Sequence, residues 1–478
     1  MDFAATICFL VLYYIRPYEH TWGLLYQLVG WMKPIQMVTV VGIVSMFRRP
    51  LGIKKSDFLQ TPHDWFMLIL FTHIVLTAGE FDRIKYAFNS LLPVFVFYIL
   101  IVQALGNLER LEKFLTVWIT MILVLASLSL LSLSGFDPTG GRDIVDGMMK
   151  GRFIFNTSIF NNPNALGHSV VPAIPLVYFL FIWQRPVFVK IPAIFLILLP
   201  AFCVFQTQSK GAFLAGGVTL LFSMLFKRHW VLQATMLMLT FGVGITLIQK
   251  LPRMNEFSKS EGGIQGRQIA MEFGYDLTTV QAKWTGVGYK KYRETMQEQL
   301  DGIGIANHGS YNEIGTNAGQ IGLFLYLGLL YLSMRVLLLA KPRSIREDRV
   351  QRLLFIFVVS FAISAWVIDW AYRATYFFTA ATVASFHRLM IKSRERDLSV
   401  DNEDGQILEE EDIPEEQQAL SMGPMPSSYP TGTKSKQEEQ STGYGIQWKR
   451  VGFFDMIMMT SILYLCLYIW KLMIESEF

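Results

Sequence analysis

The chain has 478 residues, of which 52% are hydrophobic, 14% aromatic and only 17% charged, and its mean hydropathy is +0.36. This composition excludes an ordinary soluble domain. The net charge of +4 comes from short basic clusters between apolar runs, which excludes a nucleic-acid footprint. The sequence therefore predicts an integral membrane protein.

The apolar runs predict an all-α, polytopic transmembrane bundle of about 12 spans. A basic cluster, Arg48 to Lys55, follows the second run and marks a cytoplasmic loop by the positive-inside rule. Alternation from this loop predicts four more cytoplasmic loops before Lys392, and each of them is basic. The predicted spans, with an additional one at the C-terminus, are 3–15, 35–47, 65–78, 86–104, 114–134, 165–183, 187–205, 211–226, 231–248, 320–339, 353–368, 374–391 and 451–471.

The charge pattern also divides the chain into three parts. Residues 1–396 form the membrane domain, whose large non-cytoplasmic loop, 249–319, contains an amphipathic helix. From 397 to 448 hydrophobicity collapses and acidic, Pro, Ser and Gln residues dominate, which predicts a disordered cytoplasmic linker. Residues 449–478 predict a C-terminal transmembrane helix.

No motif indicates a cofactor or a metal. The cysteines Cys8, Cys203 and Cys466 all lie in apolar runs, where a thiol behaves as a small hydrophobe. Gly286-Val-Gly288-Tyr289 is too short to be a nucleotide fingerprint and predicts a turn that brings the backbone close to a neighbour.

Basic residues in the outer loops are the candidates for binding an anion. Lys210 opens a predicted helix, where the helix N-terminus and a cation both favour negative charge. Arg267 offers a planar fork that suits phosphate oxygens. Arg152 is the basic residue of the first outer loop.

His308 is the sharpest catalytic candidate, because an imidazole with a pKa of about 6.5 can transfer protons near neutrality. Tyr311, Asn312 and Glu313 follow it three to five residues later, a spacing that clusters them near one face of a starting helix. We expect these three to support the site, with Glu313 orienting the imidazole or capping a helix.

Three motifs, in this order and on the outer side, resemble the O-antigen ligase and polymerase family of bacterial membrane glycosyltransferases. The similarity spans roughly residues 152–332. The motifs are Gly151-Arg-Phe with Asn161-Asn-Pro-Asn-Ala-Leu-Gly167, Thr207-Gln-Ser-Lys-Gly-Ala212, and Gly286-Val-Gly-Tyr with the His308 segment ending in Gly319-Gln-Ile-Gly322.

The resemblance implies a helical bundle with a large periplasmic loop, and transfer of a glycan from undecaprenyl diphosphate to an acceptor hydroxyl without metal or cofactor. It implies that His308 is the catalytic base and that Arg267, Lys210 and Arg152 bind the diphosphate. Lys210 stands where the family commonly has arginine, and Gly309 stands where an Asn usually follows the histidine.

The resemblance leaves ligase and polymerase as alternatives, with a glycan, lipid or protein as acceptor. It implies a multi-pass protein of the bacterial inner membrane with a periplasmic active face. Other classes remain open: a transporter or flippase of lipid-linked sugars, for which no internal repeat is visible, and a non-enzymatic assembly subunit.

Overall fold

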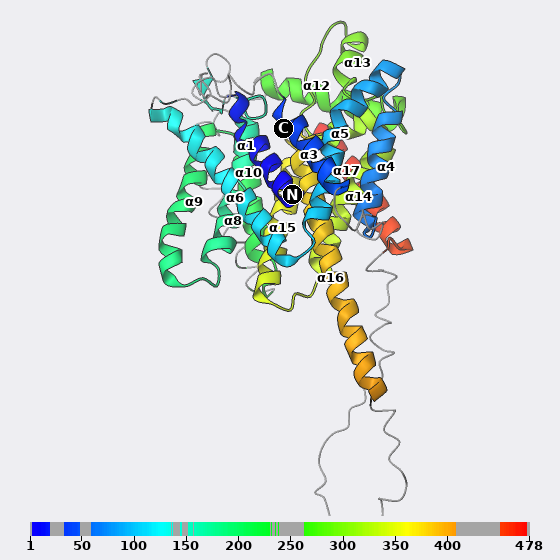
Figure 1. Cartoon of the computed structure of the whole chain (residues 1–478). Coiled ribbons are helices and arrows are strands. Elements are labelled where there is room, and N and C mark those ends of the chain that lie inside the picture. The colour runs from blue at the N-terminus through cyan, green and yellow to red at the C-terminus, as the bar shows by residue number, and fades with distance from the viewer. Residues whose placement is uncertain are drawn as a thin grey trace, which may run out of the picture.

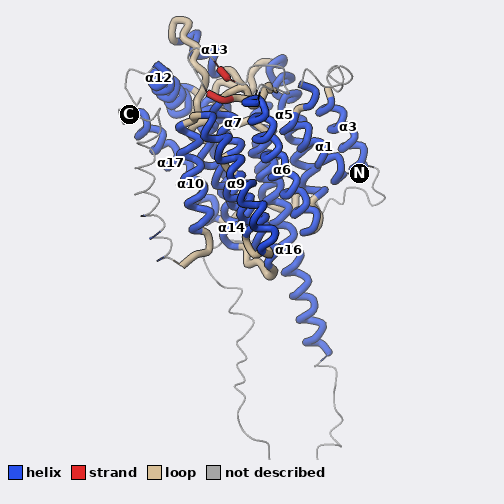
Figure 2. The backbone as a smooth tube through the Cα atoms, turned by 90° about the vertical axis from the view of Figure 1, so that its left-hand side faces the viewer, coloured by secondary structure: helices blue, strands red, loops and turns tan. Residues whose placement is uncertain are grey.

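The computed structural model describes residues 2–19, 33–47, 59–134, 136, 144–145, 152–155, 157–229, 231, 235, 238, 262–407 and 450–475. Within these ranges the regular structure is helical (Figures 1 and 2), apart from one short antiparallel ladder. The ladder pairs β1 (Ile144–Val145) with β2 (Arg152–Phe153). The predicted all-α class is therefore confirmed.

The first half of the chain builds one side of the bundle. Local signals begin its helices: Asp64 accepts hydrogen bonds from the backbone N–H and hydroxyl of Thr61, and Asn107 accepts one from the N–H of Arg110. The elements are α1 (Asp2–Ile15), η1 (Pro17–Glu19), α3 (Pro34–Phe47), α4 (Pro62–Leu76), α5 (Phe81–Ala104), α6 (Leu108–Leu131), η2 (Ser132–Ser134), α7 (Pro163–Val170), α8 (Ala173–Val177), the π-helical turn η4 (Tyr178–Ile182), α9 (Val187–Thr207) and α10 (Lys210–Leu225).

The second half contributes the outer segment and the rest of the bundle. Short polar helices lie across the upper end in Figure 1, and longer apolar ones cross the body. The elements are α12 (Gly262–Asp276), the π-helical turn η6 (Leu277–Gln281), α13 (Tyr292–Gln299), α14 (Ser310–Leu339), α15 (Ile345–Ser364), α16 (Ala374–Ile407) and α17 (Phe453–Glu475). The part of the predicted large loop that the structure describes thus contains the helices α12 and α13, joined by irregular segments.

Six helices among the described residues are long and apolar enough to cross a membrane, so the predicted count of about 12 is not confirmed. Several predicted spans are short helices, such as α4 and α10 with 15 and 16 residues, below the roughly 17 to 25 residues that a span needs. The span predicted at 231–248 lies almost entirely outside the described residues. The six are Phe81–Ala104, Leu108–Ser134, Pro163–Ile182, Val187–Thr207, Ser310–Leu339 and Phe453–Glu475.

Two predicted boundaries differ from the structure. α14 begins at Ser310, not at residue 320. α16 continues to Ile407 and protrudes from the bundle (Figure 1), into the segment predicted as linker. A helix already started by buried residues extends without a new nucleation cost, which explains the continuation into polar sequence. The remainder of the predicted linker, 408–448, lies outside the described residues.

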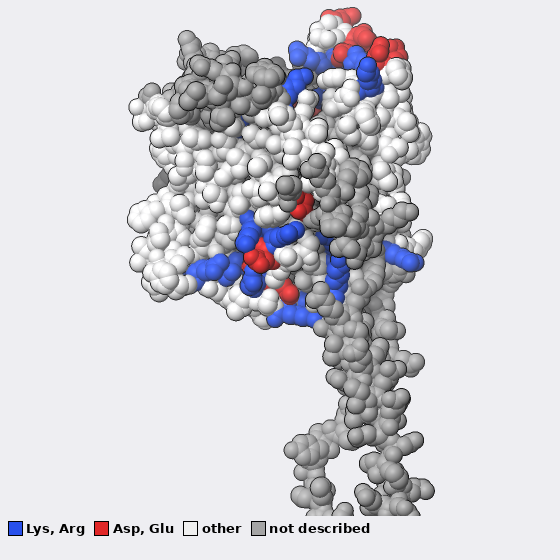
Figure 3. All heavy atoms as spheres, in the orientation of Figure 1, with Lys and Arg blue, Asp and Glu red and all other residues white. Residues whose placement is uncertain are grey.

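The loops predicted as cytoplasmic meet at one end of the bundle. Arg346 Nε donates to Glu112 at 2.8 Å, and Lys227 Nζ lies 2.6 Å from Asp348. Figure 3 shows basic side chains gathered toward the lower end of the visible face. These contacts join three loops that alternation had placed on the same side.

The C-terminal helix α17 packs against α14 and α12. Asp455 of α17 lies 3.3 Å from Arg335 of α14, with both side chains almost fully buried, and it accepts a hydrogen bond of 2.8 Å from Tyr331. At the other end, Trp470 Nε1 donates to the carbonyl of Met271 in α12 at 3.1 Å. The predicted C-terminal helix is therefore an integral part of the bundle.

Replacing Asp455 with Ala should destabilise the protein by about 3–5 kcal/mol, because it leaves the Arg335 guanidinium buried beside no carboxylate. Thermal unfolding in detergent, followed by circular dichroism, measures the loss. The double variant Asp455→Leu with Arg335→Met is the control and should recover most of the stability, since neither charge remains. An unchanged unfolding temperature for Asp455→Ala would contradict a structural role for this ion pair.

Candidate active site

An interruption of α14 at Gly319 shapes the centre of the site. Gly319 has φ 67° and ψ −171°, which separates the stretch 310–318 from the apolar stretch that follows. A Cβ there would overlap the backbone of Trp284. Irregular backbone in a membrane protein is tolerated only where its polar groups find partners, so the surroundings of this break decide whether it can exist.

The Gly286 turn supplies those partners. The N–H groups of Val287 and Gly288 donate to the carbonyls of Thr316 and Asn317 at 2.9 and 3.0 Å. Across the break, the N–H of Gln320 donates to the carbonyl of Lys283 at 2.7 Å. This confirms the prediction that Gly286-Val-Gly-Tyr forms a turn that brings backbone against a neighbour.

The first turn of α14 is held from its other side by the connection between α15 and α16. Ser310 is the anchor: its N–H donates to the carbonyl of Ala365 at 2.7 Å, its hydroxyl donates to the carbonyl of Ile368 at 2.7 Å, and it accepts from the N–H of Trp370 at 2.9 Å. Groups that would be orphaned at a helix start are thereby satisfied. His308 lies two residues before this anchor in the sequence.

Gly309 packs directly against this connection. A Cβ built on Gly309 would lie 3.1 Å from the carbonyl oxygen of Trp366. The asparagine that the resemblance implies at this place would require that backbone to shift by a few tenths of an ångström.

His308 is half-buried and precedes α14 in an irregular segment. Burial, together with the positive charge of Arg267, lowers the pKa of His308 to about 4. Arg267 is an exposed residue of α12. It lies 41 positions before His308 in the sequence, yet its charge acts on the imidazole. The imidazole is neutral at pH 7 and has an unprotonated nitrogen available to accept a proton.

The three predicted supporting residues bind three different elements. Tyr311 donates through its hydroxyl to the carbonyl of Ala362 in α15 at 2.9 Å, and Asn312 donates to the carbonyl of Ala270 in α12 at 3.5 Å. Glu313 accepts from the N–H of Ala371 at 3.0 Å, just before α16. These side chains position the helices around His308. This hydrogen bond holds the turn before α16 and matches neither of the two roles expected for Glu313.

Lys210 lies where the first two motifs meet. The hydroxyl of Ser209 accepts a hydrogen bond from the N–H of Ala212 at 3.3 Å, and so caps α10. The same hydroxyl donates to the side-chain oxygen of Asn164 at 2.7 Å, which links α10 to the start of α7. Lys210, half-buried, is the first residue of α10. The two motifs, separate in sequence, thus form one polar junction.

His168 is a residue that the analysis of the sequence missed. It lies on α7 with 3% of its surface exposed, and its Nδ1 is 2.8 Å from the hydroxyl of Ser364. Arg267 acts electrostatically on His168 as it does on His308. The signal that would have found it is its spacing: His168 is four residues after Asn164, on the same face of the helix.

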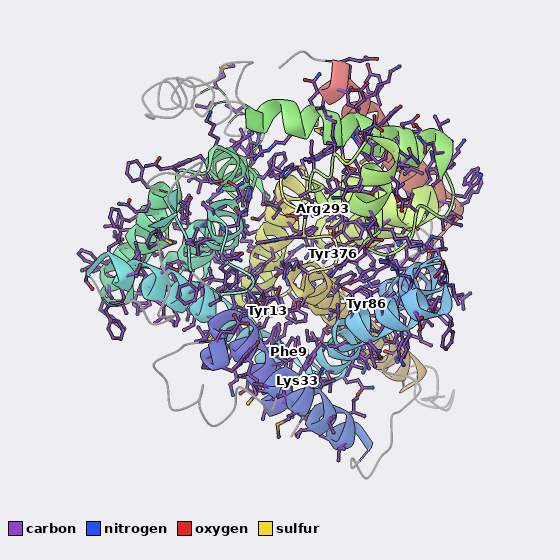
Figure 4. The ribbon with its side chains drawn as sticks, turned by 90° about the horizontal axis from the view of Figure 1, so that it is seen from above. Phe9, Tyr13, Lys33, Tyr86, Arg293 and Tyr376 are labelled. Carbon is purple, nitrogen blue, oxygen red and sulfur yellow. The ribbon has the colours of Figure 1, made fainter. Side chains whose placement is uncertain are left out.

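Arg152 is the remaining predicted site residue. It begins β2, which packs against α9, and its side chain lies outside the described residues. Arg267 lies on α12, which crosses the upper end of the bundle in Figure 1, and Figure 4 looks down onto this end. Among the residues that the structure describes, no group of three or more His, Cys, Asp or Glu is placed to hold a metal ion.

The helices and this polar end define a polytopic membrane protein with a cationic, histidine-containing site at one end of its bundle. A family model described as O-antigen ligase matches residues 193–327. Over this segment the chain is similar to the O-antigen ligase family, which confirms the resemblance drawn from its motifs. The matched segment contains Lys210, Arg267 and His308. No curated protein matches the chain.

Replacing Gly319 with Ala should cost about 1–3 kcal/mol for the left-handed backbone alone, and the overlap with Trp284 adds to it. Thermal unfolding of the purified variant measures this. Gly217→Ala on α10 is the matched control: a Cβ there meets nothing within 4 Å, so the unfolding temperature should be unchanged or slightly higher. Equal unfolding temperatures for both variants would contradict the role assigned to the break.

Proposed function

We propose that the protein is an O-antigen ligase-like glycosyltransferase that moves a glycan from an undecaprenyl-diphosphate carrier to an acceptor hydroxyl at the periplasmic face. The transfer is metal-independent and inverts the anomeric carbon. The observation that carries the proposal is a half-buried imidazole, His308, that feels the positive charge of Arg267 inside the segment that the family model matches.

The donor already carries a good leaving group, so the enzyme mainly needs to stabilise negative charge that grows on the diphosphate. Arg267 and Lys210 supply fixed positive charge, and the N-terminus of α10 adds its dipole. Arg152 is proposed as a third cation. Charges held in place before the reaction act as a divalent ion would, because no reorganisation is required when the bond breaks.

His308 is proposed to take the proton of the acceptor hydroxyl as it attacks the anomeric carbon. A base with a pKa of about 4 is weak, but the value belongs to the protein without donor. A diphosphate bound at Arg267 brings negative charge that offsets the guanidinium. Opposite charge raises the pKa of an imidazole, so donor binding itself strengthens the base.

A polymerase of the same family would use the same donor chemistry and differ in the acceptor, a growing glycan instead of a separate lipid or protein. A lipid-linked sugar transporter is the alternative from another class. The interruption of α14 is an observation that favours a transporter, since transporters use discontinuous helices at their binding sites. Movement of the labelled lipid across a vesicle membrane without any transfer product would identify a transporter.

Transfer by the purified protein from an undecaprenyl-diphosphate oligosaccharide tests the proposal. His308→Ala should lower the rate about 10²–10⁴-fold, the usual contribution of a general base, and Arg267→Ala should also reduce it. His229→Ala, an exposed histidine outside the proposed site, is the matched control and should transfer like the wild type. Undiminished transfer by a well-folded His308→Ala protein would rule out the base assignment.

The pH dependence offers a separate test. The acid limb of kcat/KM reports the free protein and should lie near pH 4, while the limb of kcat, which reports the donor complex, should lie higher. Burial is the main cause of the low pKa of His308, and the charge of Arg267 is the second cause. Arg267→Gln removes only the second, so its kcat/KM limb should move to higher pH, part of the way toward the ordinary value of about 6.5. A limb that stays in place, or moves down, contradicts the electrostatic link.

A further inference from the structure

We infer that His168 and the N-terminus of α10 form a binding site for a phosphate oxygen of the lipid diphosphate. The inference rests on the proposed function and adds to it a residue outside the segment that the family model matches. It depends on three observations about His168: an unpartnered ring nitrogen, a hydroxyl that orients the ring, and a gap at Gly211.

The Nε2 atom of His168 is the first observation. It is buried and has no hydrogen-bond partner among the described residues. A buried polar atom that lacks a partner destabilises the fold, so its retention needs a reason. A ligand that supplies the missing partner is such a reason.

The orientation of the ring is the second observation. The hydroxyl of Ser364 lies 2.8 Å from Nδ1. When this hydroxyl donates to Nδ1, the ring proton stays on Nε2, which then acts as a donor. Ser364 is the last residue of α15, next to Ala365, which accepts from Ser310. The ring is therefore tied to the same connection that holds the start of α14.

Gly211 provides the third observation. A Cβ at Gly211 would lie 3.1 Å from Nε2 of His168, a tight contact, so the glycine lets the start of α10 approach the ring where any other residue would crowd it. This close approach is the gap. Gly211 is the second residue of the 16-residue helix α10. Its backbone N–H is among those that have no acceptor within their own helix, and the positive end of the helix dipole lies at the same point.

The ligand class follows from the charges around this gap. Nε2–H and the Gly211 N–H are donors, Lys210 precedes the gap, and Arg267 acts electrostatically on the ring. Donors and positive charge together favour an anionic oxygen over a cation or a neutral hydroxyl. A phosphate of the donor, placed between α10 and Arg267, meets this description and lies on the route toward His308.

Binding of undecaprenyl diphosphate to the purified full-length protein, measured by native mass spectrometry, tests the site. His168→Ala should raise Kd about tenfold, the effect of one lost charge-assisted hydrogen bond. Gly211→Ala should weaken binding similarly by filling the gap. His168→Gln restores an N–H near the position of Nε2 and should bind within about threefold of the wild type. His229→Ala, with its histidine outside the site, is the control and should leave Kd unchanged.

The outcomes separate this inference from the proposed function. A wild-type protein that binds the lipid, with His168→Ala and Gly211→Ala binding equally well, overturns the site and leaves the glycosyltransferase proposal standing. A wild-type protein that does not bind undecaprenyl diphosphate overturns the proposed donor. If His168→Ala does not fold, Gly211→Ala and His168→Gln still test the site. Equal affinities of these two variants for undecaprenyl diphosphate would contradict the inference.

Discussion

Backbone hydrogen bonds on both sides of the interrupted start of α14 are the constraint on which the rest of the site depends. The Gly286 turn binds the carbonyls of Thr316 and Asn317 from one side, and the connection after α15 binds Ser310 from the other. Without these partners the break at Gly319 would leave polar groups unsatisfied. His308 therefore precedes a helix start that is held mainly by main-chain groups of the neighbouring segments.

The site is assembled from three polar junctions that share this framework. Ser209 joins α7 to α10, Ser364 joins His168 to α15, and Asn312 joins α14 to the helix that carries Arg267. The cationic and imidazole groups therefore come from helices that are fixed to one another. Such preorganisation is what electrostatic stabilisation of a departing diphosphate requires. The C-terminal helix contributes through Trp470, which binds α12 four residues after Arg267.

Much of this was predictable, and the failures have physical causes. Apolar runs identify helices well because each spanning segment must satisfy its own backbone. They do not distinguish a long span from a short buried helix, as α4 and α10 show. The polar start of α14 carried no apolar signal, so the helix was predicted to begin near residue 320. His168 was passed over because it continues an apolar run, and only its contacts reveal it.

The sequence by itself determined the membrane class, the helical fold, the glycine turn and the motifs that resemble the O-antigen ligase family, because these depend on composition and on local order along the chain. Tertiary structure decided which charges meet. Arg267 acts electrostatically on His308 because α12 packs against α14, and His168 lies near Gly211 because α7 packs against α10. Electrostatic and hydrogen-bond energies depend on distances of a few ångströms, and spacing along the chain does not specify distances between helices.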